Sequence, residues 1–226
     1  PKDPAALATF AKEWGTDSLN FSESHFANQL FENCKKGIIK FLHIAGEDPV
    51  HSWYKGSLVR DALRTVPFLV VQDVYMTETA KMADIVLPTT TFAEKDGSYT
   101  NMTRHVQPVT HAILPEGNSK SDFDIFSELA KALQKPFKHV SVEEVQEEIR
   151  RVTPVYNKVL PPTYSKQWTP EGFHIKPKFA IPQGFKESSP KKGYSLLTNN
   201  HMFHIGSYSQ YAKALKDIRP DCIAEI

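Results

Sequence analysis

Three short apolar runs alternate with helix-like segments in the first half of the chain, and each run stops at a turn-forming residue. The runs occupy residues 38–45, 68–72 and 84–87, and they are rich in residues that favour strands. Between them, residues 56–65 and 77–82 have the spacing of short helices. This alternation predicts a doubly wound α/β fold with a mostly parallel sheet and right-handed crossovers. Apolar strands in such a sheet are expected to be buried on both faces.

Further helices are predicted on both sides of the strand region. Residues 4–14 and 23–34 precede the first strand, and Gly37 is expected to end the second of these helices. A helix over 121–133 begins at a Ser-Asp-Phe-Asp sequence, and Ser141 opens a capping-box pattern for the next helix. The amphipathic helices should turn one stripe of residues inward: Leu58, Val59, Ala62 and Leu63 in the first, and Phe123, Phe126, Leu129 and Leu133 in the second.

The character of the sequence changes after this helical region, where prolines become frequent and hydrophobic periodicity stops. We therefore predict an α/β domain over residues 1–152, an extended proline-rich connector over 153–192, and the beginning of a second domain over 193–226. Strand-like sequence at 194–198 and 223–226 gives that second domain too little core of its own. We expect it to continue beyond the residues given.

The overall composition is that of an ordinary globular protein. The chain has 226 residues, 40% of them hydrophobic, and a net charge of +1, which excludes the strong basic field of a nucleic-acid-binding protein. No apolar run approaches the roughly 20 residues that cross a bilayer, so direct membrane insertion is not expected. Cys34 and Cys222 form no metal or redox motif. The first residue is Pro1 rather than methionine, and we expect the natural polypeptide to begin upstream.

Polar residues cluster where the predicted strands end, which is where open α/β sheets bind ligands. The turn Gly46-Glu47-Asp48-Pro49 follows the first run, and its glycine would let the backbone approach a phosphate. A plain turn with two solvated acids would look the same. Gln72-Asp73 ends the second run, and a carboxylate there could accept two hydrogen bonds from a guanine or a ribose. The hydroxyls of the following Thr77-Glu78-Thr79 could hold phosphate or simply cap a helix.

The third run stops at Pro88 and leads into a dense polar loop. The adjacent charges Glu94, Lys95 and Asp96 either form an acid–base group or lie in a solvated turn, since Asp-Gly is a strong turn dipeptide. Residues 99–106 are expected to form an irregular β arm. No nucleophile elbow, phosphate loop or dinucleotide fingerprint of glycines occurs, so no residue is predicted to be catalytic.

Two histidines are spaced in a way that could suggest a metal site. His201 and His204 are three residues apart, but the sequence offers no third ligand near them. We therefore predict no metal ligand in this chain.

Four segments have the order and spacing found in a known family. Residues 46–49, 71–80, 83–101 and 121–133 resemble corresponding segments of the molybdopterin oxidoreductase superfamily, and the resemblance extends over 38–134. It implies a Rossmann-like α/β domain that holds one guanosine arm of a molybdopterin guanine dinucleotide. It also implies that a β-barrel-like C-terminal domain follows.

The resemblance extends to individual residues. The cofactor-binding residues that it implies, including the border formed by the polar loop, are Gly46, Asp48, Asp73, Thr77, Glu94 and Asp96. The family's iron–sulfur cysteines and its molybdenum-ligating residue precede this domain. Iron–sulfur clusters are therefore expected only in upstream parts.

Two departures from the family pattern bear on which branch the chain resembles. Residues 102–105 read Met-Thr-Arg-His where the family usually has Glu-Gly-Arg, and Asn199-Asn200 replace a Gly-Arg pair of formate-dehydrogenase-like members. This version looks more like the large iron–sulfur G-type subunit of NADH:quinone oxidoreductase (respiratory complex I). Some such subunits keep the fold without the molybdenum cofactor, and the loss of an arginine that would pair with phosphate points the same way.

Three hypotheses remain open at this stage. In the first, the chain is a scaffold part of the electron-transfer subunit of an NADH:quinone oxidoreductase, cytoplasmic and held at the inner membrane by other subunits of a redox complex. In the second, it is the cofactor-binding part of a molybdenum or tungsten enzyme such as formate dehydrogenase, whose α subunit is the next resemblance. In the third, it is a stand-alone nucleotide-binding or interaction domain.

Overall fold

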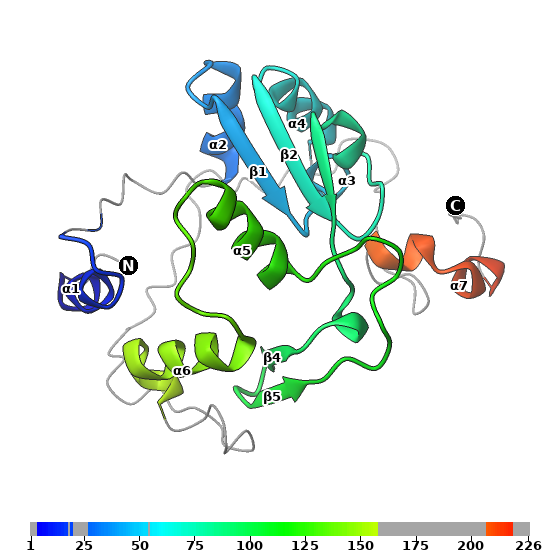
Figure 1. Ribbon diagram of the computed structural model, residues 1–226. Coiled ribbons are helices and arrows are strands. Elements are labelled where there is room, and N and C mark those ends of the chain that lie inside the picture. The colour runs from blue at the N-terminus through cyan, green and yellow to red at the C-terminus, as the bar shows by residue number, and fades with distance from the viewer. Residues whose placement is uncertain (1–3, 18, 20–26, 54, 158–206, 219–226) are drawn as a thin grey trace, which may run out of the picture. The chain divides into compact units, whose positions relative to one another are not determined.

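The chain divides into two compact units, Pro1–Gly172 and Phe173–Ile226. The computed structural model describes residues 4–17, 19, 27–53, 55–157 and 207–218 (Figure 1). In the second unit, the described residues form a 3-10 helix η4 (Ser207–Tyr211) and a short helix α7 (Lys213–Ile218). The strands predicted at 194–198 and 223–226 and nearly all of the connector lie outside the described residues, so the three-part domain division stays a prediction.

A three-stranded parallel sheet organises the first unit. Its strands are β1 (Phe41–Ala45), β2 (Phe68–Asp73) and β3 (Ile85–Pro88), and β2 lies in the middle. Ala45 pairs with Gln72, and Gln72 pairs with Leu87, so the three strands end at the same edge. The predicted parallel pairing is therefore confirmed, and the three strand-ending loops are neighbours in space.

One face of the sheet carries the hydrophobic core. Leu69 and Val71 of β2 point to this face, where α2 (Ala27–Lys35), α3 (Pro49–Ser52) and α4 (Gly56–Leu63) cover them (Figure 1). Burying such side chains contributes roughly 1.5–3 kcal/mol each, which makes this layer the main source of stability. The core residues contributed by helices and loops are Phe31, Cys34, Val50, Val59, Ala62, Leu63, Val66 and Ala80.

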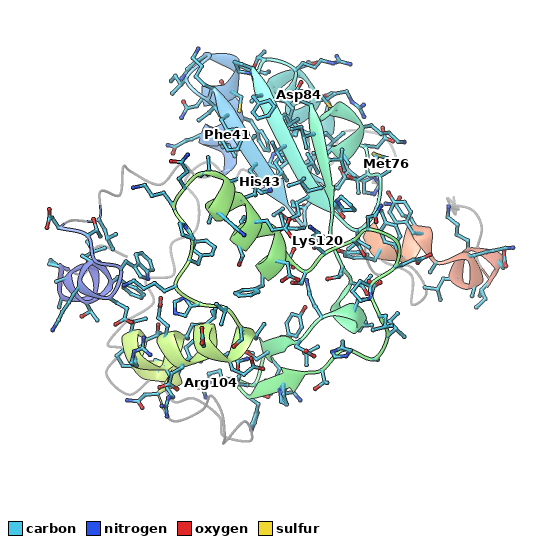
Figure 2. All side chains as sticks on the ribbon, viewed as in Figure 1. Phe41, His43, Met76, Asp84, Arg104 and Lys120 are labelled. Carbon is cyan, nitrogen blue, oxygen red and sulfur yellow. The ribbon has the colours of Figure 1, made fainter. Side chains whose placement is uncertain are left out.

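The opposite face of the sheet is only partly covered. Phe41, Phe68 and Ile85 share this face and are 57%, 41% and 44% exposed. The helix α5 (Asp122–Ala132) reaches the sheet near its carboxyl edge, where the Phe126 ring lies 5.5 Å from that of His43 (Figure 2). The expectation that the strands are buried on both faces is therefore wrong for β1 and β3, which are the edge strands among the described residues, and it holds for β2 from Leu69 to Asp73.

The predicted inner stripe of α5 is also wrong. Phe126 and Leu129 are 39% and 36% exposed and Leu133 is 74% exposed, whereas Ile125 and Ala130 are the buried residues. Helical periodicity identifies which residues share a face, but it does not say how much of a sheet that face covers. In α4, where the helix lies directly over the sheet, Val59, Ala62 and Leu63 are buried as expected.

Local signals set the ends of several elements as predicted. Gly37 has a φ of 67°, a backbone conformation that favours glycine, and the chain leaves α2 there. The Ser121 hydroxyl accepts a hydrogen bond from the Asp124 N–H at the start of α5, and Ser141 caps α6 (Val142–Val152) in the same way. The hairpin β4 (Gly97–Thr100) and β5 (Val106–Val109) is the expected β arm.

The remaining described elements are short or terminal. Helix α1 (Pro4–Glu13) contacts α6, where the Trp14 indole N–H donates to Glu148 and Arg151 pairs with Glu13. The segment predicted as a helix over 77–82 contains the 3-10 helix η1 (Ala80–Met82). Two more 3-10 helices are η2 (Phe92–Glu94) and η3 (Pro154–Tyr156).

Asp84 fixes the far end of β2, away from the strand-ending loops. Its Oδ2 accepts the Leu69 N–H at 2.7 Å, and its own N–H donates to the Leu69 carbonyl at 2.9 Å (Figure 2). This reciprocal pair sets where β3 begins relative to β2. The Ala-Asp start of the family-like loop is thus a structural anchor rather than part of a ligand site.

A glycine contact in the core layer generates a stability prediction. A Cβ at Gly56 would lie 2.3 Å from the Val50 carbonyl oxygen, so Gly56→Ala should destabilise the fold by about 1–3 kcal/mol. Gly97→Ala is the matched control, because nothing lies within 4 Å of a Cβ there. Urea unfolding of both variants measures the difference, and equal stability of the two would contradict the contact.

Candidate functional site

The turn after β1 places an open stretch of backbone at the carboxyl edge of the sheet. Gly46 has a φ of 66°, its N–H donates to the Gln72 carbonyl at 2.8 Å, and no atom lies within 4 Å of where its Cβ would be. The sequence prediction placed Gly46 where a ligand approaches the backbone. The conformation and the open space are compatible with that role, which stays a prediction.

Asp48 ties this turn to the loop that follows β2. Its side chain is buried, and its Oδ1 accepts hydrogen bonds from the N–H and Oγ1 of Thr79 at 3.1 and 2.5 Å. The Val50 N–H donates in turn to Thr79 Oγ1 at 3.2 Å. Asp48 therefore has a structural use that the sequence did not reveal, and Thr79 is its partner.

Asp73 lies at the end of β2 with a buried carboxyl. Burial raises the pKa of Asp73 above its ordinary value, and the negative charges of Asp48 and Glu47 add to this increase. Hydrogen bonds from the Tyr75 and Val74 N–H groups to Oδ1 lower it in part. The carboxyl is thus held at the strand end that open α/β sheets use for ligands.

Thr77 is buried in the same loop, four residues after Asp73. Its Oγ1 accepts a hydrogen bond from the N–H of Ala80, the first residue of η1, at 3.1 Å. Thr77 thus supports the start of η1, whereas Thr79 occupies the N-cap position without a side-chain cap bond. Its predicted contact with a nucleotide stays a prediction.

A second group of polar side chains centres on Asp122, the first residue of α5. Its Oδ1 accepts hydrogen bonds from Gln72 Nε2 at 2.6 Å and from Thr89 Oγ1 at 2.8 Å. Its Oδ2 pairs with the Lys95 ammonium. Burial raises the pKa of Asp122, but the hydrogen bonds from Lys95, Thr89 and Gln72 outweigh it and hold the pKa below its ordinary value.

The Asp122 group joins the ends of β2 and β3 to α5 through side chains far apart in the sequence. The backbone supports the same junction, because Lys120, just before α5, forms a parallel bridge with Thr89. Of these residues, the sequence analysis had singled out only Gln72 and Lys95, and it had not linked them. The sequence signal for this group was Asp122, a polar residue at the start of a helix that follows the polar loop.

Two buried polar atoms at this edge have no hydrogen-bond partner within the described residues. They are Oε1 of Gln72, a side chain that is 0% exposed, and Oγ1 of Thr90, which is 1% exposed. An unsatisfied buried polar group costs about 1–3 kcal/mol, so such atoms mark places where a ligand or water belongs. The unpartnered Gln72 oxygen and Thr90 hydroxyl fit an organic cofactor rich in N–H groups.

Glu94 and Asp96 support the polar loop itself. Glu94 accepts from the Thr91 N–H and Oγ1 at 2.7 and 2.8 Å and from the Glu116 N–H at 2.9 Å, and these bonds lower its pKa. Asp96 accepts from the His111 N–H at 2.8 Å, which, with the contact to the His111 ring, lowers its pKa. Both carboxylates are thus occupied locally, and their predicted role as a border of the nucleotide site stays a prediction.

A cavity of about 630 Å³ lies between the polar loop, the hairpin and the first turns of α5 and α6. Its lining includes Lys95, Tyr99, Asp122, Phe123 and Val142. Because Lys95 and Asp122 form part of its wall, the exposed side of the Asp122 group faces a space large enough for a planar ring system.

No metal centre is found in the part of the chain that the structure describes. Within those residues, no group of three or more histidine, cysteine or acidic side chains is placed to hold an ion. His201 and His204 lie outside the described residues. None of the described helices has the length and apolar character needed to span a bilayer.

Comparison with known proteins gives the family. Residues 5–132, more than half of the chain, match the profile of the molybdopterin oxidoreductases. The chain belongs to the molybdopterin oxidoreductase family. The resemblance seen in the strand-ending loops is therefore confirmed at the family level, and a molybdopterin-type cofactor goes with it.

Several relatives of this family are α subunits of multi-subunit oxidoreductases. The chain is 41% identical over 167 residues to the F420-dependent formate dehydrogenase subunit alpha of Methanocaldococcus jannaschii, covering 73% of this chain and 24% of that protein. It is 34% identical over 153 residues to formate dehydrogenase H of Escherichia coli, covering 68% of this chain and 21% of that protein. The NADPH-Fe(3+) oxidoreductase subunit alpha of Geobacter sulfurreducens is 32% identical over 220 residues, with 96% and 25% covered.

The chain spans about a quarter of the length of these curated relatives. They support the formate dehydrogenase resemblance, whereas closeness to the complex I subunit is not shown. Among solved structures, acetylene hydratase from Pelobacter acetylenicus has a similar fold, with a TM-score of 0.54 at 17% identity over 73% of this chain and 24% of that chain.

The buried bond between Asp48 and Thr79 gives a second stability prediction. Asp48→Ala should cost about 1–3 kcal/mol, because it leaves the Thr79 N–H without its acceptor inside the fold. Asp48→Asn keeps an acceptor oxygen and should cost less. Chemical denaturation of the two variants measures this, and an equal loss in both would show that the charge rather than the acceptor matters.

The raised pKa of Asp73 predicts a pH-dependent stability difference. The pKa of Asp73 is higher in the folded state than in the unfolded state. Its stabilising contribution to the free energy of unfolding is therefore fully present below the unfolded-state pKa of about 4, and it is lost as the pH rises through the folded-state pKa. The wild type should therefore lose stability relative to Asp73→Asn between about pH 4 and neutrality. Unfolding free energies of both proteins across that range test it, and a constant difference would contradict burial as the cause.

Proposed function

We propose that this chain is the cofactor-binding α/β part of a formate-dehydrogenase-type α subunit. In this proposal it holds the organic part of a molybdopterin guanine dinucleotide along the carboxyl edge of its sheet. The single observation that carries the proposal is the convergence of the Gly46 turn, Asp73 and the Asp122 group at that edge, in a chain of the molybdopterin oxidoreductase family.

The residues at the edge divide into those that present polar groups and those that build the loops. Asp122 is the acceptor on the cavity side, and Gly46 and Asp73 present backbone and carboxyl at the neighbouring strand ends. Asp48, Thr77, Glu94 and Asp96 hold the loops in place through their own hydrogen bonds, and in this proposal they border the nucleotide. When bound, the cofactor supplies the two-electron redox chemistry of its molybdenum or tungsten centre.

The proposed work of this chain is binding and orientation. Lys95, Gln72 and Thr89 fix the Asp122 carboxylate before any ligand arrives, so little ordering remains when one binds. None of the described residues is proposed as catalytic. The redox steps and the iron–sulfur clusters belong, in this proposal, to other parts of the full polypeptide and to partner subunits.

The names of the relatives favour the formate dehydrogenase hypothesis over the complex I scaffold. The proteins from M. jannaschii, E. coli and G. sulfurreducens are two formate dehydrogenases and an NADPH-Fe(3+) oxidoreductase. We infer other redox subunits as partners, because two of these three proteins are described as α subunits. The complex I subunit without cofactor is the rival that the experiment must separate.

Cofactor content of the natural full-length protein tests the proposal. We expect stoichiometric molybdenum or tungsten by mass spectrometry, a pterin by its fluorescence after oxidation, and formate-dependent reduction of a dye. Protein that carries iron but neither molybdenum, tungsten nor pterin would instead support the complex I scaffold.

A matched pair of variants ties the cofactor to this edge. Asp122→Asn should lower the retained pterin by about tenfold, since a charge-assisted acceptor is lost. Asp61→Asn is the control, because Asp61 is an exposed carboxylate of α4 that pairs with Arg64 and does not line the cavity. Equal pterin content in the two variants would place the cofactor elsewhere.

A further inference from the structure

The Lys95–Asp122 ion pair lies at the boundary between the polar network and the cavity. The Lys95 and Asp122 side chains are 24% and 41% exposed, and both line the cavity. The two other partners of Asp122, Gln72 and Thr89, are 0% and 6% exposed. Asp122 is therefore the member of the group that an incoming molecule can contact directly.

The two carboxylate oxygens of Asp122 have different hydrogen-bond partners. Oδ1 accepts from Gln72 Nε2 and Thr89 Oγ1, at 2.6 and 2.8 Å, and this fixes the rotamer of the carboxylate. Oδ2 receives only the Lys95 ammonium among the described residues. A carboxylate oxygen accepts more than one hydrogen bond, so Oδ2 keeps capacity for a further donor.

The charge of Asp122 also fixes the orientation of the Gln72 side-chain amide. An ionised carboxylate can only accept hydrogen bonds, so the amide nitrogen of Gln72 must face it and the carbonyl oxygen must face away. That oxygen is buried and has no partner among the described residues. If Asp122 were protonated, it could donate, and neither the polarity of Oδ2 nor the orientation of the Gln72 amide would be fixed.

We propose that Lys95 is a positioning residue that keeps Asp122 ionised and thereby makes this site select a ligand edge that presents a hydrogen-bond donor. The fitting chemistry is a single donor such as the 2-amino group of a 2-aminopyrimidin-4-one ring, which can fill the one open position on Oδ2. This inference rests on the proposed function, because pterin and guanine both carry that ring. It adds the preference of the site for hydrogen-bond donors, and it names Lys95 as the residue that causes this preference.

Lys95 is the charged group that acts on Asp122. The groups of β2 and of the loop after β3 that face Asp122 are the neutral side chains of Gln72 and Thr89. Among the other charged groups around α5 and the cavity, Lys120 pairs with Glu128 at 2.6 Å, Asp124 accepts from Ser121, and Glu94 accepts from Thr91. Asp96 accepts from His111, and Glu143 of α6 also lines the cavity. Removing the Lys95 charge should therefore change Asp122 more than any other carboxylate.

The test measures binding to the cofactor-free full-length protein. The probes are GDP against IDP, which lacks the amino group, and pterin against lumazine, in which an oxo group replaces it. We expect the amino-bearing member of the pair that binds to do so about tenfold more tightly. Comparing GDP with pterin identifies which of the two rings occupies this position.

Variants of Lys95 separate positioning from simple support of the loop. In Lys95→Met, the acid limb of the binding profile should move upward by roughly one pH unit or more, because Asp122 then protonates more easily. Lys95→Arg should restore the wild-type profile. Lys131→Met is the matched control, since it removes the same charge from an exposed lysine in the last turn of α5 that does not line the cavity, and its profile should not move.

Each other outcome overturns the inference. If Lys95→Met weakens binding by the same factor at every pH, Lys95 only supports the loop. If Lys95→Met behaves like Lys131→Met, it has no role in selection. If the wild type binds neither ring, the proposed function fails, and the nuclear magnetic resonance signal of the Gln72 amide protons still tests the Asp122 contact: in Lys95→Met, their loss of hydrogen bonding should begin at a higher pH than in the wild type.

Discussion

The parallel, in-register pairing of β2 with β1 and β3 is the constraint on which the rest of the structure depends. Since the three strands run in the same direction and end together, the loops after Ala45, Asp73 and Pro88 meet at one edge. Antiparallel pairing would place the middle loop at the opposite edge. The polar residues of the three loops then become neighbours in space, although they are far apart in the sequence.

Buried hydrogen bonds turn this shared edge into a defined arrangement of side chains. Asp48 joins the first loop to the second through Thr79, and Asp122 joins the ends of β2 and β3 to α5. Each bond contributes only about 1 kcal/mol net, but leaving one of its partners unsatisfied inside the fold costs more. The loops therefore hold their shape mainly because the alternatives leave buried groups without partners.

Local patterns predicted the elements well, whereas burial and partners required the structure. The strand over 68–72, the turn at Gly46, the cap at Ser121 and the β arm follow from residues close in sequence. Full burial of β1 and β3 was wrong because apolar sequence does not reveal that a strand is an edge strand. The bond between Gln72 and Asp122 spans 50 residues, and no periodicity connects two polar residues at that distance.

The charge run in the polar loop shows how the structure changes the interpretation of adjacent residues. In sequence, Glu94, Lys95 and Asp96 suggested either one acid–base group or one solvated turn. In the structure they have three separate tasks: Glu94 caps η2, Asp96 holds His111, and Lys95 crosses to Asp122. Each of the three charges therefore has its own partner, and they do not form one acid–base group. The loop therefore holds its own shape through Glu94 and Asp96 and fixes the Asp122 carboxylate of α5 through Lys95.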